Sequence, residues 1–251
     1  MKSSVIAMNF SGVYAAVPPG LGAPAELIDF SDITGTNRYC DSEAQEEIRK
    51  RIAGFSAEGI HFLDSGNYHY ASKFWTDKIT EPFALFVFDH HTDMQPPRFP
   101  GVLSCGSWVK EVIDGNVRLR GTAIAGVPPL RISEAGEEYK AKVRFFSDEE
   151  ILSEDSRRDC AQLLKDVPAY ISIDKDALRK EDAATDWDQG PLSLAELEDA
   201  LAKISAEHRI IGIDVCGETS DTDDARETAL NARTNGELLK FFREKCPEFF
   251  R

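Results

Sequence analysis

Long apolar runs and paired cysteines are both missing from this chain. No stretch of about 18 consecutive apolar residues occurs, which argues against a membrane-spanning helix. The N-terminal MKSSVIAMNFSGVYAAVPPG has only a short apolar stretch, without the longer hydrophobic region of a signal peptide. No C-x-x-C pair suggests a zinc ribbon or a redox motif, and the five cysteines are widely spaced at Cys40, Cys105, Cys160, Cys216 and Cys246. We therefore expect a cytoplasmic protein in a reducing compartment.

Basic residues are scarce as well. Lys and Arg number 29 against 44 Asp and Glu, so the formal net charge is −15. Phosphate backbones are held mainly by a surplus of Lys and Arg, and the charge balance therefore argues against a nucleic-acid partner. With 251 residues, 42% of them hydrophobic, the chain can bury a sizeable core, and we expect one domain over residues 1–251.

Short apolar, β-rich runs alternate with helical patterns along the whole chain. The runs predict strands at Val5–Asn9, Leu27–Phe30, Ile60–Leu63, Phe83–Phe88, Thr122–Ala125, Val143–Phe146, Ala169–Ile173 and Ile210–Val215. The patterns predict helices at Ser42–Ile52, Tyr70–Lys78, Gly106–Ile113, Asp148–Ile151, Ser156–Leu164, Ser193–Ser205 and Glu227–Lys245. This alternation predicts an α/β fold of three layers, with a mainly parallel sheet covered by helices on both faces.

Two of these strands end in acidic clusters. Phe83–Phe88 runs directly into Asp89-His90-His91-Thr92-Asp93, and Ala169–Ile173 runs into Asp174-Lys175-Asp176. Ligands of parallel sheets bind outside the carboxyl ends of the strands, so these clusters are candidate site residues. Side chains alternate in an extended backbone, and every second residue of each cluster would therefore point to the same side.

Four carboxylates gathered at adjacent strand ends would repel one another unless cations compensate them. Two divalent ions supply +4 against the four Asp charges, which favours a pair of metals over one. Oxygen-rich ligation with a few imidazoles suits manganese better than a structural zinc site. A water shared by two such ions becomes a nucleophile near neutral pH, and hydrolysis is the expected reaction class.

Several segments together resemble the arginase/agmatinase/formiminoglutamase (ureohydrolase) family. FVFDHHTDMQ resembles its D-x-H-x-D segment, YISIDKDAL its S-x-D-x-D segment and SGNYHYAS its G-G-D-H segment, in the same order along the chain. DQGPLSLAEL and IIGIDVCGE resemble two later segments. The resemblance covers about residue 65 to the C-terminus with gaps, and it implies an arginase-like fold for a divergent member.

The resemblance also implies a set of ligands and an activity. Two divalent metal ions, with Mn²⁺ favoured, would be held by His69, Asp89, His91, Asp93, Asp174 and Asp176. Asp89 and Asp174 would each bridge both ions. The implied activity is hydrolysis of a C–N bond in a guanidino, amidine or related small molecule, and a homo-oligomer is implied too.

The chain departs from the family at several positions. A family histidine that would shuttle protons is replaced by Cys105, which is either a small buried residue or a group with an altered catalytic role. The acidic residue that would face a guanidinium is Glu218, shifted by one position. Together with Asp93, these two are the catalytic candidates. No counterpart of the segment that reads an α-amine is evident, which makes true arginase activity a poorer fit than action on another guanidino, amidine or amide compound.

Four other polar or aromatic residues are candidates for substrate binding: Asn37, Arg38, Gln95 and Trp187. Arg38 could pair with a substrate carboxylate, and Trp187 could wall a substrate slot. Two alternatives are equally good: Arg38 could be a solvated arginine in a turn, and Trp187 could simply anchor its loop.

Two other functions stay open beside the ureohydrolase. Deacetylases resemble this fold and carry the D-x-H element, but they use one zinc and would not need His69, Asp93 and Asp176 together. A catalytically silent relative that binds metal is the second alternative, because the loop histidine is missing.

Overall fold

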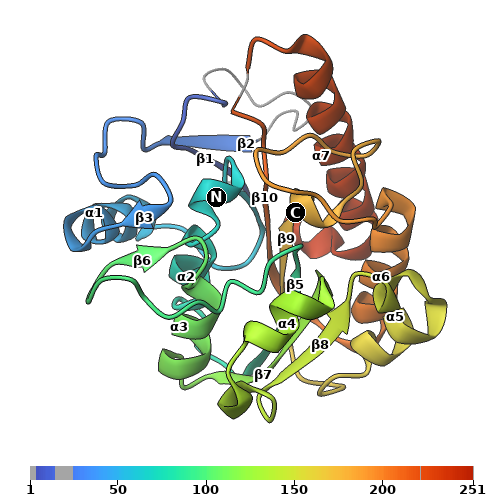
Figure 1. The fold of residues 1–251 in the computed structure, drawn as a ribbon. Coiled ribbons are helices and arrows are strands. Elements are labelled where there is room, and N and C mark those ends of the chain that lie inside the picture. The colour runs from blue at the N-terminus through green and yellow to red at the C-terminus, as the bar shows by residue number, and fades with distance from the viewer. Residues whose placement is uncertain (1–3, 15–24, 221, 251) are drawn as a thin grey trace.

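A single sheet of eight parallel strands runs through the molecule (Figure 1). The computed structural model describes residues 4–14, 25–220 and 222–250. In spatial order the strands are β2 (Ala25–Asp29), β1 (Val5–Asn9), β4 (Ile60–Phe62), β10 (Ile210–Cys216), β9 (Ala169–Asp174), β5 (Phe83–Phe88), β7 (Leu119–Val127) and β8 (Val143–Ser147). Every pairing in this sheet is parallel, which confirms the predicted fold class.

Helices cover both faces of the sheet, so the architecture has three layers (Figure 1). One face carries α1 (Ser42–Ile52), α2 (Ala71–Thr76) and α3 (Trp108–Gly115), and the other carries α5 (Glu154–Ala161), α6 (Leu194–Glu207) and α7 (Ala225–Lys245). The central strands are buried along their whole length, because helices remove both of their faces from water. This explains why β5 appears in the sequence as a continuous apolar run and why β9 is mainly apolar up to Asp174.

Several short elements were not expected from the sequence. They are the two-stranded antiparallel pair β3 (Tyr39–Cys40) and β6 (Leu103–Ser104), helix α4 (Pro129–Glu134), and the 3₁₀ turns Gly66–Tyr68, Glu137–Tyr139, Lys175–Ala177 and Pro247–Phe250. The helix expected at Asp148–Ile151 is a 3₁₀ turn at Glu150–Leu152. Elements of two to six residues bury too few side chains to leave a periodic pattern. The polar stretch 180–191 is the expected loop.

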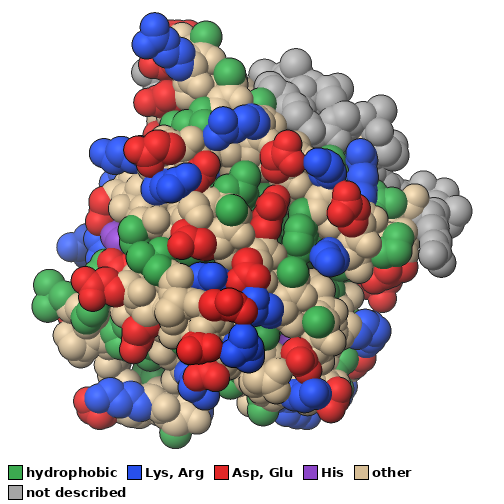
Figure 2. Space-filling view, turned by 90° about the vertical axis from the view of Figure 1, so that its right-hand side faces the viewer, with side chains coloured by type: hydrophobic (Ala, Val, Ile, Leu, Met, Phe, Trp, Pro, Cys, Tyr) green, Lys and Arg blue, Asp and Glu red, His purple; other side chains and the backbone are tan. Residues whose placement is uncertain are grey.

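The charge distribution on the surface and the character of the helices agree with the expectations from composition, which argued against a nucleic-acid partner and a membrane-spanning helix. Acidic and basic side chains are interspersed over the face drawn in Figure 2, where the described residues form no continuous basic band. No helix in the described part of the chain combines the length and apolar character needed to cross a bilayer.

A histidine on β4 is part of the hydrophobic core. The ring of His61 stacks on that of Trp75 at 3.7 Å between centroids, and its Nδ1 lies 3.3 Å from the Tyr170 hydroxyl. Burial lowers the pKa of His61 to about 3. A histidine in an unfolded chain has a pKa of about 6.5. Between these two values the unfolded chain binds more protons than the folded one, so stability is lost as the pH falls.

We predict that His61→Phe flattens this acid-side loss of stability. The phenyl ring keeps the stacking on Trp75 but cannot take up a proton. Urea unfolding between pH 7 and pH 4, in the presence of a chelator, measures the effect as the slope of the unfolding free energy against pH. Phe62→Leu, the next residue on the same strand, is the control and should keep the wild-type slope. Equal slopes for His61→Phe and the wild type would contradict the prediction.

Candidate metal centre

The acidic clusters meet at the carboxyl edge of the sheet because β5 and β9 are neighbours there. Asp89 directly follows β5, and Asp174 is the last residue of β9. His69 reaches the same place from the 3₁₀ turn that follows β4. Strand order and the turn after β4 thus make neighbours of residues that lie 86 to 103 positions apart in the chain.

One group of ligand-type side chains gathers around His69. Its Nδ1 lies 3.1 Å from an oxygen of Asp89, 3.1 Å from one of Asp93 and 3.6 Å from one of Asp174. All four side chains are buried. The donor atoms of His69, Asp89 and Asp93 are close enough together to hold one ion.

A second group gathers around His91. Its Nδ1 lies 2.8 Å from Asp176 and 3.4 Å from the other oxygen of Asp89. These three residues could also hold one ion. Asp89 therefore takes part in both groups. Asp174 belongs with His69, and its expected role as a second bridge stays a prediction.

The electrostatics of this cluster fit divalent cations. Burial, reinforced by neighbouring carboxylates, raises the pKa of Asp174 and of Asp176. Burial lowers the pKa of His91, but Asp176 and Asp89 outweigh it and raise the pKa to about 11. Nδ1 of His69 and Oδ2 of Asp89 are both buried and lie only 3.1 Å apart, yet neither atom makes a hydrogen bond. Buried polar atoms are nearly always satisfied, and a cation between these two would satisfy both.

A second set of hydrogen bonds holds the ligands in place. The Ser172 hydroxyl lies 2.8 Å from Nε2 of His69 and donates to Asp214 at 2.5 Å, which leaves Nδ1 of His69 facing the carboxylates. The Trp108 indole donates to Asp93 at 2.7 Å. Outer partners of this kind fix the orientation of metal-binding imidazoles and carboxylates.

The cluster forms the floor of a cavity of about 940 Å³. Asp89, His91, Asp93, Asp174 and Asp176 line it below, together with the predicted residues Arg38, Gln95, Cys105 and Trp187. The Arg38 guanidinium lies over the Trp187 ring at 5.0 Å, and its Nε donates to Asn67 at 3.2 Å. Burial, and next the charge of Asp93, raise the pKa of Cys105 to about 12, so its thiol is protonated at neutral pH.

Two predicted residues lie elsewhere. Asn37 is exposed and is not among the described residues that line the cavity, because the backbone turns at Arg38, whose φ is +62°. Glu218 is buried and also absent from that lining. These positions argue against the substrate-binding role expected for Asn37 and the catalytic role expected for Glu218.

One oxygen of the Glu218 carboxylate, Oε1, has three partners. It lies 2.8 Å from the buried Lys175 ammonium and accepts hydrogen bonds from Tyr14 at 2.9 Å and Asn235 at 2.7 Å. The preceding Gly217 has φ +89°, and a Cβ there would collide with the Asp174 carboxylate. The one-residue shift therefore turns the acid away from the cavity and brings a glycine against the Asp174 carboxylate.

Sequence reasoning did not single out four residues of this site. Arg98 and Arg131 line the cavity with Asp188, while Cys216 lies beside Asp174. Asp188 bridges Arg131 at 2.5 Å and Nε2 of His91 at 3.3 Å. One signal in the sequence pointed to Asp188, which stands next to the predicted residue Trp187. Its bridge to Arg131 joins segments 57 residues apart and could not be read from the sequence.

Comparisons with known proteins agree with this geometry. Residues 28–236 match the model of the Arginase family. An uncharacterised protein of Thermotoga maritima is 29% identical over 220 residues, which cover 80% of this chain and 81% of that protein.

Solved structures share the fold. Proclavaminate amidino hydrolase from Streptomyces clavuligerus has a TM-score of 0.71 at 16% identity, covering 97% of this chain and 93% of that one. Formiminoglutamase of Trypanosoma cruzi with Mn²⁺ has a TM-score of 0.66 at 11% identity, covering 96% and 93%. With its sheet, its acidic strand ends and a family match over most of its length, this chain belongs to the Arginase family.

Proposed function

We propose that this chain is a binuclear metal-dependent hydrolase of C–N bonds in small guanidino or amidine compounds. The observation that supports it most is the buried pair formed by Nδ1 of His69 and Oδ2 of Asp89, which lie 3.1 Å apart without a hydrogen bond, where Asp89 and its neighbouring carboxylates line the cavity. A purely structural cluster of carboxylates would be expected to satisfy these atoms internally.

The chain's own residues divide the work. His69 and Asp93 would hold one ion, His91 and Asp176 the other, with Asp89 shared and Asp174 beside the first. When bound, two divalent ions, Mn²⁺ first among the candidates, supply the Lewis acidity that makes water a nucleophile near neutral pH. Ser172 and Trp108 keep His69 and Asp93 oriented throughout.

The charges of the cavity suggest the form of the substrate. A planar guanidinium or amidine cation fits the acidic floor, where Asp188 holds His91. The rim instead carries Arg38 and Arg98, each donating through one nitrogen to a neutral partner, Asn67 or Tyr39. Such arginines recognise carboxylates well. We infer a substrate with a cationic C–N group at one end and a carboxylate at the other.

The leaving amine needs a proton. Cys105 lines the cavity where the resemblance predicts a histidine, and its raised pKa keeps the thiol protonated. A thiol of this pKa is a poor proton shuttle at neutral pH, since efficient acids titrate near the working pH. This observation favours the alternative of a relative that binds metal without turnover, and the experiment below includes that outcome.

We predict that Asp89→Ala loses both metals, because Asp89 contacts both groups, whereas Asp176→Ala weakens chiefly the His91 position. Metal per chain after gel filtration measures this directly. Asp182→Ala, an acidic residue outside the cavity, is the control and should bind like the wild type. Two metals retained in Asp89→Ala would contradict the shared-ligand arrangement.

We further predict that the Mn²⁺-loaded protein releases urea, ammonia or a small amide from a guanidino or amidino acid. Arg38→Ala should raise KM for that substrate about tenfold or more with kcat little changed, because a charge-assisted hydrogen bond contributes about 1.5–3 kcal/mol. Arg118→Ala is the matched control. Arg118 directly precedes β7, at the edge of the sheet opposite the one that carries the cavity.

The same substrate panel should include acyl amides. Release of a carboxylic acid from an acyl amide would instead indicate a deacetylase-like enzyme. Two bound metals without turnover of any compound would indicate the silent relative, and absence of bound metal would contradict the proposal altogether.

A further inference from the structure

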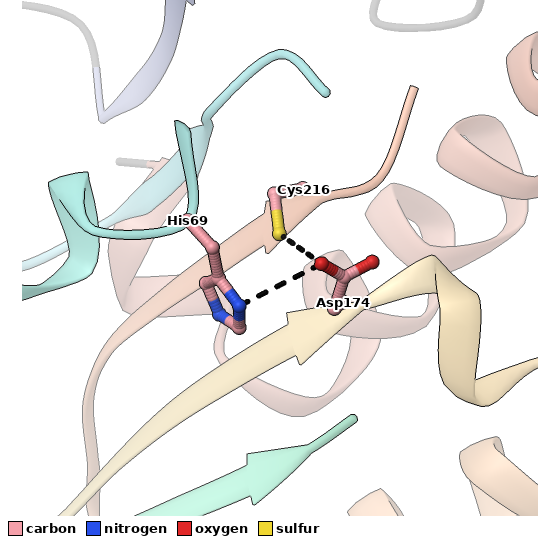
Figure 3. Close-up of side chains that lie close together, drawn as sticks. All are labelled: His69, Asp174 and Cys216. Atoms are coloured by element: carbon pink, nitrogen blue, oxygen red, sulfur yellow. Dashed lines mark hydrogen bonds and ion pairs between the residues drawn. The ribbon is translucent and has the colours of Figure 1, made fainter. Parts of the chain in front are cut away.

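A buried cysteine completes the His69 side of the cluster. Cys216 is the last residue of β10 and pairs in register with Asp174 on β9. Its Sγ lies 3.1 Å from Oδ2 of Asp174, the same oxygen that lies 3.6 Å from Nδ1 of His69 (Figure 3). The sulfur, the carboxylate oxygen and the imidazole nitrogen all fall within 4.8 Å of one another.

The surroundings of Cys216 keep its sulfur in this place. The side chain is completely buried, and the chain turns away immediately after it at Gly217. Because Gly217 has no Cβ, the backbone can approach the Asp174 carboxylate closely. The cysteine is therefore held against the ligands by the strand register on one side and by the turn on the other.

An independent feature points from this place to a cation. Nδ1 of His69 is buried and has no hydrogen-bond partner, although it faces Asp89, Asp93 and Asp174. An ion seated there would lie among nitrogen, oxygen and sulfur donors. The other four cysteines are not grouped with metal-ligand side chains in the described part of the chain.

We propose that Cys216 is a sulfur ligand of the metal held by His69 and Asp174, an inference that rests on the proposed binuclear site. Binding replaces the thiol proton, which passes to solvent, by a metal–sulfur bond. Thiolate ligands favour zinc and other thiophilic ions over manganese. The two positions therefore differ: the His69 position selects a softer metal, and the His91 position keeps oxygen and nitrogen ligands only.

The test is a competition between metals. The metal-free full chain is equilibrated with equal concentrations of Zn²⁺ and Mn²⁺, and both metals are counted after gel filtration. We expect both positions to prefer zinc, and the His69 position of the wild type to prefer it more strongly than the His91 position does. We expect Cys216→Ser to lower that zinc preference about tenfold or more, on the scale that single partners of a metal site contribute. Cys246→Ser, also a buried cysteine, should match the wild type.

X-ray absorption of the zinc-loaded wild type keeps the inference testable if Cys216→Ser does not fold. We expect one sulfur at about 2.3 Å from zinc. A shell of oxygen and nitrogen alone, or an unchanged zinc preference in Cys216→Ser, would overturn the inference and leave the thiol as a hydrogen-bond donor to Asp174. These results would leave the proposed hydrolase intact, whereas failure to bind any metal would remove the proposed function itself.

Discussion

Repulsion between buried carboxylates at the ends of β5 and β9 is the constraint on which the rest of the site depends. Asp89, Asp174 and Asp176 lie close together out of water, and burial together with the neighbouring carboxylates raises the pKa of Asp174 and of Asp176. His69 and His91 compensate part of this charge in the protein alone. Two divalent cations would compensate the remaining charge, and a cation beside Nδ1 of His69 and Oδ2 of Asp89 would satisfy two buried atoms that make no hydrogen bond.

The fold provides this concentration of charge without strain in the strands themselves. The parallel order β10-β9-β5 places three carboxyl ends side by side, and the helices that bury the strands supply the apolar packing. Loops that follow the strands then carry chemistry that the core does not constrain. Above the acidic floor, Arg38 and Arg98 give the rim the opposite sign in a chain with a net charge of −15. A substrate that carries both charges matches this gradient better than a simple cation.

The central sheet could be predicted from local apolar patterns, whereas the six proposed ligands followed from the resemblance to the ureohydrolase family, and the structure brings these six residues together. The apolar run of β5 is readable from its own six residues. The extended alternation expected from Asp89 to Asp93 is not what the structure shows, because residues 90 and 91 form a bend and Asp93 has φ +49°. Positions set by backbone turns were not readable: Glu218 points to Lys175 and Asn37 points to solvent. The Arg131–Asp188 bridge and the approach of Cys216 to Asp174 depend on tertiary contacts between distant segments, for which a single sequence carries no signal.

The binuclear centre is the central claim, and anomalous diffraction from crystals of the Mn²⁺-loaded protein tests it most directly. The account predicts two manganese peaks per chain at the carboxyl ends of β5 and β9, about 3.5–4 Å apart, as in two-metal hydrolytic sites. It predicts that one peak lies against His69 and the other against His91. A single peak, two peaks too far apart to share Asp89, or none at this edge of the sheet would contradict it.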